Sequence, residues 1–149
     1  LALLRHPAQL ALLRANPALT ATAVEELLRY DSPVQLTSRT VHETLEVDDH
    51  LFPKGVEINF VLGAANRDPA AFAEPNVLDI TRKPNPHLAF GGGIHYCLGA
   101  PLARLEAQIA FVTLLQRFPH LTLLDDDPPY RDNYLLRGVK RLPVGRGGE

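Results

Sequence analysis

The longest helical pattern in the sequence directly follows a glycine-rich loop that contains the only cysteine of the chain. The loop reads Phe-Gly-Gly-Gly-Ile-His-Tyr-Cys-Leu-Gly over residues 90–99. From residue 98 to about 118, apolar residues recur at helical spacing, and Pro101 lies where the first turn would be. This pattern predicts a long, largely buried helix with Cys97 just before its N-terminus. Any fold of this chain must therefore place the cysteine loop beside a helix.

Two further helices and a group of short strands are predicted upstream. Apolar residues at helical spacing indicate helices over residues 7–15 and 20–30. β-Branched and apolar residues between turn signals then predict strands over residues 34–41, 44–47 and 56–62. Residues 52–55, Phe-Pro-Lys-Gly, are typical of a hairpin turn.

The segment between the strands and the cysteine loop has no clear periodicity. Residues 66–89 carry four prolines, which predicts an ordered, meandering connection with buried positions at Phe72, Val77, Leu78 and Ile80. After the long helix, two or three short strands are expected within residues 121–124, 134–138 and 141–144. The predicted class is α+β, mainly α, in one domain over residues 1–149.

This list is short of helices for covering every apolar face. The chain also begins with Leu1 and contains no methionine. We therefore expect residues 1–149 to be a fragment of a larger domain.

Composition restricts the possible partners. Hydrophobic residues make up 46% and charged residues 21%, as in globular proteins. The net charge of −2, with scattered basic residues, indicates no nucleic-acid or anionic-membrane partner. No apolar run approaches the roughly 18 residues that span a bilayer. A lone cysteine fits a reducing compartment, so a cytoplasmic location is expected.

A cysteine at a helix N-terminus has a distinctive environment. Unpaired N–H groups and a partial positive charge stabilise a thiolate there. Gly93 and Gly99 leave room for a bulky planar ligand, and Phe90 offers an aromatic wall. Such a thiolate is a nucleophile or a metal ligand; the alternative is a buried structural cysteine. His95 is a candidate base for a nucleophile, but no third orienting group is evident, and His95 with Cys97 supplies too few ligands for zinc.

The loop resembles the F-x-x-G-x-H-x-C-x-G signature of the cytochrome P450 family, the haem-thiolate monooxygenases. The defining positions are filled by Phe90, Gly93, His95, Cys97 and Gly99. Residues 100–111 are also similar to the buried helix behind the haem in bacterial members. The resemblance implies haem b as cofactor, with Cys97 as the axial thiolate, a donor that favours O–O cleavage. It also implies that the rest of the loop, including Gly91, borders the haem.

The family's E-x-x-R pair is matched by Glu26 and Arg29 on the second predicted helix. The resemblance implies a structural role, in which this pair fixes the helix to the meander. The alternative is an ordinary surface ion pair, for which Glu25 would serve equally well. The third arginine of the family's network is replaced by Val77, and Arg82 is a nearby substitute.

The resemblance also assigns residues around the cofactor. Arg39 matches an arginine that donates a charge-assisted hydrogen bond to a haem propionate, with His95 as a second donor. Apolar residues placed by position alone are possible substrate contacts or plain core: Val34, Leu36, Leu135 and Leu136.

The activity implied is hydroxylation of a small apolar substrate with O₂ and two electrons from a ferredoxin or flavin-type donor. The match is in the style of bacterial members without a membrane anchor. The match covers only the C-terminal part of the family's fold, so residues 1–149 are expected to be a C-terminal fragment of one haem-thiolate monooxygenase domain. The family's acid–alcohol helix has no counterpart in these residues, so the fragment alone is expected to be inactive. The alternative is a non-catalytic haem-binding remnant or pseudo-enzyme.

Overall fold

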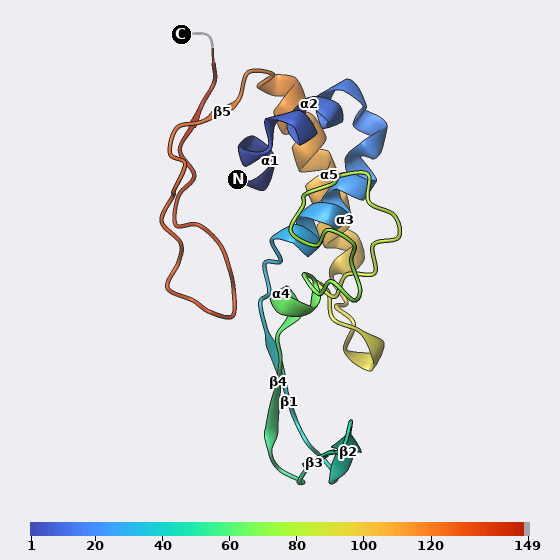
Figure 1. Ribbon diagram of the computed structural model, residues 1–149. Coiled ribbons are helices and arrows are strands. Elements are labelled where there is room, and N and C mark those ends of the chain that lie inside the picture. Colours follow the sequence, from blue (N-terminus) through green and yellow to red (C-terminus); the bar gives the residue numbers. More distant parts are fainter. Residues whose placement is uncertain (148–149) are drawn as a thin grey trace.

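The computed structural model describes residues 1–147 and gathers most of the helices at one end of the molecule (Figure 1). The helices are α1 (Ala2–Arg5), α2 (Pro7–Ala15), α3 (Thr20–Tyr30), α4 (Leu62–Ala65) and α5 (Ala100–Arg117), with 3-10 turns η1 (Pro17–Leu19) and η2 (Gly93–His95). The strands are β1 (Thr37–Thr40), β2 (Leu45–Val47), β3 (His50–Phe52), β4 (Glu57–Phe60), β5 (Thr122–Leu123) and β6 (Val144–Gly145). The predicted mixed class, with helices and small sheets, is confirmed.

The hydrophobic core lies where the first helices meet α5 and the meander. α2 begins at Pro7, whose fixed φ suits a first helical turn, and it ends before Pro17, where the residue ahead of a proline avoids helical geometry. The buried cluster is formed by Leu3, Leu10, Leu13, Ala23 and Ile80, with Phe111 and Leu115 of α5 packed against it. Ile80 therefore connects the meander to the helices.

Truncating Ile80 is expected to destabilise the protein substantially. The side chain is fully buried, so Ile80→Ala should lower the free energy of unfolding by about 2–5 kcal/mol through lost burial and a residual cavity. Val77→Ala is the matched control, because Val77 is 47% exposed and its truncation should cost about 0.5 kcal/mol or less. Denaturant unfolding of both variants checks this, and equal losses would contradict the packing described here.

Two burial predictions were wrong. Val77 is exposed, whereas Phe72, Leu78 and Ile80 of the meander are buried as predicted. In α5, predicted to be largely buried, Ala100 is the one fully buried residue among those described, and Leu102, Leu105 and Ile109 are more than half exposed. The reason is that apolar side chains surround the whole helix, while the core and α3 cover only one side of it.

Among residues 1–147, the strands form three separate antiparallel pairs: β1 with β4, β2 with β3, and β5 with β6. The β1–β4 ribbon leads away from the helices, and the β2–β3 hairpin lies at its far end (Figure 1). Residues 134–138 form no strand, and Leu136 makes only an isolated bridge to Val34.

The predicted hairpin turn at residues 52–55 was wrong. These residues connect β3 to β4, which pair with different strands. The hairpin turn lies instead at Asp48 and Asp49, which both have positive φ, 47° and 63°. Such φ values suit a tight two-residue hairpin turn, and aspartate tolerates them. Two aspartates mark such a turn less clearly in a sequence than a glycine would.

Across residues 1–147, no helix is long and apolar enough to cross a bilayer.

Candidate functional site

The cysteine loop folds back on itself and leaves Cys97 exposed within the described chain. The N–H of Cys97 donates to the carbonyl of Phe90 (2.9 Å), and the N–H of Gly91 donates to that of Leu88 (2.8 Å). Gly91 and Gly93 have φ of 71° and 59°, which side chains other than glycine rarely adopt. Within residues 1–147, Cys97 is therefore exposed and is not part of the buried core.

A mostly apolar cavity of about 260 Å³ opens beside the sulfur. Its lining includes Cys97 and His95 of the cysteine loop and Arg39 of β1. The apolar lining consists of Leu28, Pro33, Val34, Leu62, Ala89 and Phe90. A neighbouring cavity of about 370 Å³ is also lined by Arg39, Gly91 and His95. The hollow therefore extends from the sulfur to Arg39 and His95, whose side chains carry N–H groups that can donate hydrogen bonds.

These residues fit a haem group. A Cβ added at Gly92 or Gly93 would meet no atom within 4 Å, so open space lies along the loop. Arg39 donates from Nη1 to Thr37 Oγ1 (3.0 Å) and to the carbonyl of Ser38 (2.6 Å). Among residues 1–147, its Nε and Nη2 have no acceptor, so they are available to an anionic group in the cavity. An exposed sulfur, an apolar hollow and a cation at its rim match an iron porphyrin with carboxylate substituents.

The two predicted substrate-contact segments lie side by side, and the first of them borders this cavity. The N–H of Gln35 donates to the carbonyl of Leu135 (2.8 Å), and Val34 forms an antiparallel bridge with Leu136. Val34 also lines the cavity with Cys97. Leu36, two positions after Val34, is partly buried but does not line the cavity. Contact of these four residues with a substrate stays a prediction.

Glu26 and Arg29 form a fully buried ion pair on α3. Arg29 donates from Nε and Nη2 to the two oxygens of Glu26, both at 2.8 Å. The remaining nitrogen, Nη1, donates to the carbonyls of Asn66 and Pro75, both at 2.8 Å. Both side chains have 0% exposure, so this is no ordinary surface ion pair. These bonds connect α3 to the meander at Asn66, where it begins, and again at Pro75.

Arg82 completes this buried network. Its Nε lies 3.2 Å from both oxygens of Glu26. Val77, at the position of the family's usual third arginine, contributes only its carbonyl, which accepts bonds from Arg29 (3.2 Å) and Arg82 (3.3 Å). The N–H of Asp79 adds a bond of 3.0 Å to Glu26. The carboxylate of Glu26 therefore has donors on every side.

A second network, centred on Glu25, was missed from the sequence. Arg104 donates from Nε and Nη2 to the two oxygens of Glu25, at 2.6 and 2.9 Å. His87 Nε2 lies 2.9 Å from Glu25 Oε2. Arg104 also donates from Nη1 to the hydroxyl of Tyr96 (2.7 Å). The only sequence signal was that His87 and Arg104 flank the cysteine loop on either side.

The network shifts the titration of its members. Burial raises the pKa of Glu25, but hydrogen bonds from Arg104 and His87 outweigh it, so the pKa lies below its usual value. Burial lowers the pKa of His87 below 6.5, against the opposing effect of Glu25. The hydrogen bond from Glu25 raises the pKa of Arg104. His87 is therefore neutral near pH 7, beside a charged carboxylate–guanidinium pair.

His87 should make stability depend on pH. Because its pKa is lower in the folded than in the unfolded protein, its contribution is complete above pH 6.5 and is lost as the pH falls from 6.5 towards the folded pKa. Denaturant midpoints measured on both sides of pH 6.5 check this against His87→Gln, which keeps a donor for Glu25. The difference in denaturant midpoint between the wild-type protein and His87→Gln should change with pH. A difference that stays constant would contradict the lowered pKa of His87. Other groups facing His87 are Glu25, Glu26 and Arg104, and they remain in both proteins.

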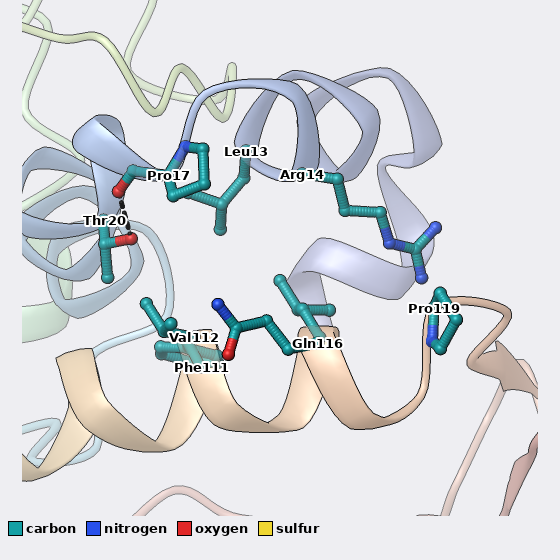
Figure 2. Close-up of a pocket in the computed structure, with 9 residues that line it drawn as sticks. Leu13, Arg14, Pro17, Thr20, Phe111, Val112, Gln116 and Pro119 are labelled. Carbon is teal, nitrogen blue, oxygen red and sulfur yellow. Dashed lines mark hydrogen bonds between the residues drawn. The ribbon is translucent and has the colours of Figure 1, made fainter.

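Another cavity, of about 250 Å³, lies at the opposite end of α5 from the cysteine loop. Figure 2 shows Leu13 and Pro17 on one side, and Phe111 and Val112 of α5 on the other. Nε and Nη2 of Arg14, which lines it, are buried without a hydrogen-bond partner among residues 1–147. This cavity is separate from the site at Cys97.

Comparisons with known proteins agree on one family. Residues 11–144 match the family described as Cytochrome P450. The chain is 54% identical over 144 residues to a biotin biosynthesis cytochrome P450 of Bacillus subtilis, covering 97% of this chain and 36% of that protein. It is 46% identical over 148 residues to the 6-deoxyerythronolide B hydroxylase of Saccharopolyspora erythraea, covering 98% and 37%.

A solved structure gives the same answer. The crystal structure of P450BioI in complex with an acyl carrier protein carrying hexadec-9Z-enoic acid matches with a TM-score of 0.93 and 54% identity, over 96% of this chain and 37% of that chain. The chain thus spans little more than a third of the length of these relatives. It belongs to the cytochrome P450 family, whose members bind haem b through a cysteine thiolate.

Proposed function

We propose that the protein acts as a haem-thiolate monooxygenase and that residues 1–149 provide the side of the haem site that carries the iron ligand. The observation that carries the proposal is the exposed sulfur of Cys97, which shares one apolar cavity with Arg39 and His95. Haem bound there would activate O₂ with two electrons and two protons, so that one oxygen atom would enter the substrate and the other would leave as water.

The residues of this chain orient and anchor the cofactor in this proposal. Cys97 supplies the thiolate, and its position is fixed by the hydrogen bond from its N–H to Phe90. Arg39 and His95 donate to the propionates. The pair of Glu26 and Arg29 fixes α3 against the meander.

We further propose a small apolar substrate. Val34, at the cavity, and Leu136, which it bridges, are apolar, as are Leu36 and Leu135. The relatives support this class: one is named as a hydroxylase of 6-deoxyerythronolide B, and another holds a hexadecenoic acid attached to its carrier protein. The two electrons come from a ferredoxin or flavin-type donor, and we expect a cytoplasmic enzyme.

Isotope labelling tests the proposed reaction. The haem-loaded protein encoded by the complete reading frame is supplied with NADPH, a surrogate ferredoxin and its reductase, ¹⁸O₂, and a panel of fatty acids and macrolactones. Each product should contain one ¹⁸O atom and should not form without the electron donor. Products that carry oxygen from water instead, or no product from any member of the panel, would contradict the proposal.

Arg39 should contribute to cofactor retention. A hydrogen bond to a charged group is worth about 1.5–3 kcal/mol, so Arg39→Ala should weaken haem binding by about tenfold to a hundredfold. Arg39→Lys is the matched control, since it keeps the charge and should lose less. The rate of haem transfer to apomyoglobin measures both, and unchanged transfer from Arg39→Ala would contradict the propionate contact.

A further inference from the structure

We propose that Glu25 is a positioning residue for the cysteine ligand, acting through Arg104 and His87 on both sides of the loop that carries Cys97. This inference rests on the proposed ligation of haem by Cys97. Glu25 and Glu26 are neighbours on α3, yet they have different partners. Glu26 bonds to the meander, whereas Glu25 bonds to residues on either side of the cysteine loop.

One connection reaches the residue directly before the cysteine. The guanidinium of Arg104 is shared between the carboxylate of Glu25 and the hydroxyl of Tyr96. Its central carbon also lies 4.6 Å from the ring centroid of Phe90, within the range of a cation–π contact. The carbonyl of Phe90 accepts the hydrogen bond from the N–H of Cys97. A shift of Arg104 would therefore displace Tyr96, which directly precedes Cys97, and Phe90, whose carbonyl accepts the bond from Cys97.

The other connection reaches the start of the loop. The N–H of Ala89 donates to His87 Nδ1 (3.2 Å), so Nδ1 is the unprotonated nitrogen of the ring. Nε2 then carries the hydrogen and donates it to Glu25 (2.9 Å). The side chain of His87 is only 2% exposed, so water does not easily replace this bond. Ala89 directly precedes Phe90, and the chain is thereby fixed to α3 just before the loop begins.

These contacts favour a positioning role over a general stabilising role. The side chains of Glu25 and Arg104 are 27% and 28% exposed, and a partly exposed ion pair contributes little to stability. What the carboxylate does is accept bonds from two segments that meet at Phe90 and Cys97. Its loss should therefore alter the ligation of the sulfur more than the stability of the fold.

The test follows thiolate ligation in the haem-loaded protein encoded by the complete reading frame. The ferrous–CO complex is prepared, and the conversion of its red-shifted thiolate band to the blue-shifted form is timed under mild denaturant. Mutation of a residue that holds a metal ligand in place typically lowers metal affinity or activity tenfold to a hundredfold. Glu25→Ala should therefore speed this conversion about tenfold. Glu106→Gln is the matched control, an exposed carboxylate on α5, and it should leave the rate unchanged.

A milder variant separates positioning from folding. Tyr96→Phe removes only the hydroxyl that Arg104 bonds, and it should speed the conversion by a smaller factor with an unchanged unfolding midpoint. If the wild-type protein shows no thiolate band, the proposed function and this inference fail together. If the wild-type protein shows the band while Glu25→Ala and Tyr96→Phe convert at the wild-type rate, this inference alone is overturned. The inference would also be overturned if Glu25→Ala converted faster but its unfolding midpoint fell strongly as well, while Tyr96→Phe converted at the wild-type rate.

Discussion

Replacing Glu26 with alanine should lower the free energy of unfolding by about 3–5 kcal/mol, which is the usual cost of breaking a buried ion pair. The change would leave Arg29 charged and 1% exposed, without its carboxylate, and Arg82 would lose the same partner. Denaturant unfolding of the purified protein measures the loss.

The neighbouring residue provides the control for this prediction. Glu25→Ala removes the same chemical group one position earlier on α3, but its ion pair with Arg104 is partly exposed. The expected loss is about 1 kcal/mol or less. Equal losses at the two positions would contradict the view that burial of Glu26 and Arg29 gives this pair its importance.

Replacing Cys97 with alanine should abolish the thiolate signature of the bound haem. Cys97 is the only cysteine of the chain and carries the only sulfur among the residues that line the cavity. Cys97→His should retain haem through a nitrogen ligand, with an altered spectrum. The spectrum of the ferric haem and the haem content of each variant measure these effects. A Cys97→Ala protein that keeps the thiolate-type spectrum would contradict the assignment.

Local patterns predicted the elements that carry the site. The cysteine loop, the helix after it and the two helices near the N-terminus all have periodicity or turn chemistry that can be read within a few residues. The burial of α5 could not be read in this way. Periodicity reports which side chains are apolar, whereas burial depends on which other elements lie against the helix, and here one face of α5 stays uncovered among the described residues.

Contacts between residues far apart in the chain could not be predicted from the sequence. Spacing allowed either Glu25 or Glu26 to pair with Arg29, because residues three and four apart share a helix face. The structure assigns Arg29 to Glu26, and it gives Glu25 a partner 79 positions away. Likewise, Arg82 was only a nearby candidate for the network of Glu26, since the path of the meander decides whether its side chain reaches the carboxylate.

The most direct test of the central claim, that the thiolate of Cys97 ligates haem iron, is a CO-difference spectrum of the reduced, haem-loaded protein. It should be recorded for the protein encoded by the complete reading frame and, beside it, for residues 1–149 alone. The account predicts a red-shifted thiolate Soret band in the complete protein, and the same band in residues 1–149 would show that this part binds haem by itself. The absence of that band from both samples would contradict the assignment of Cys97.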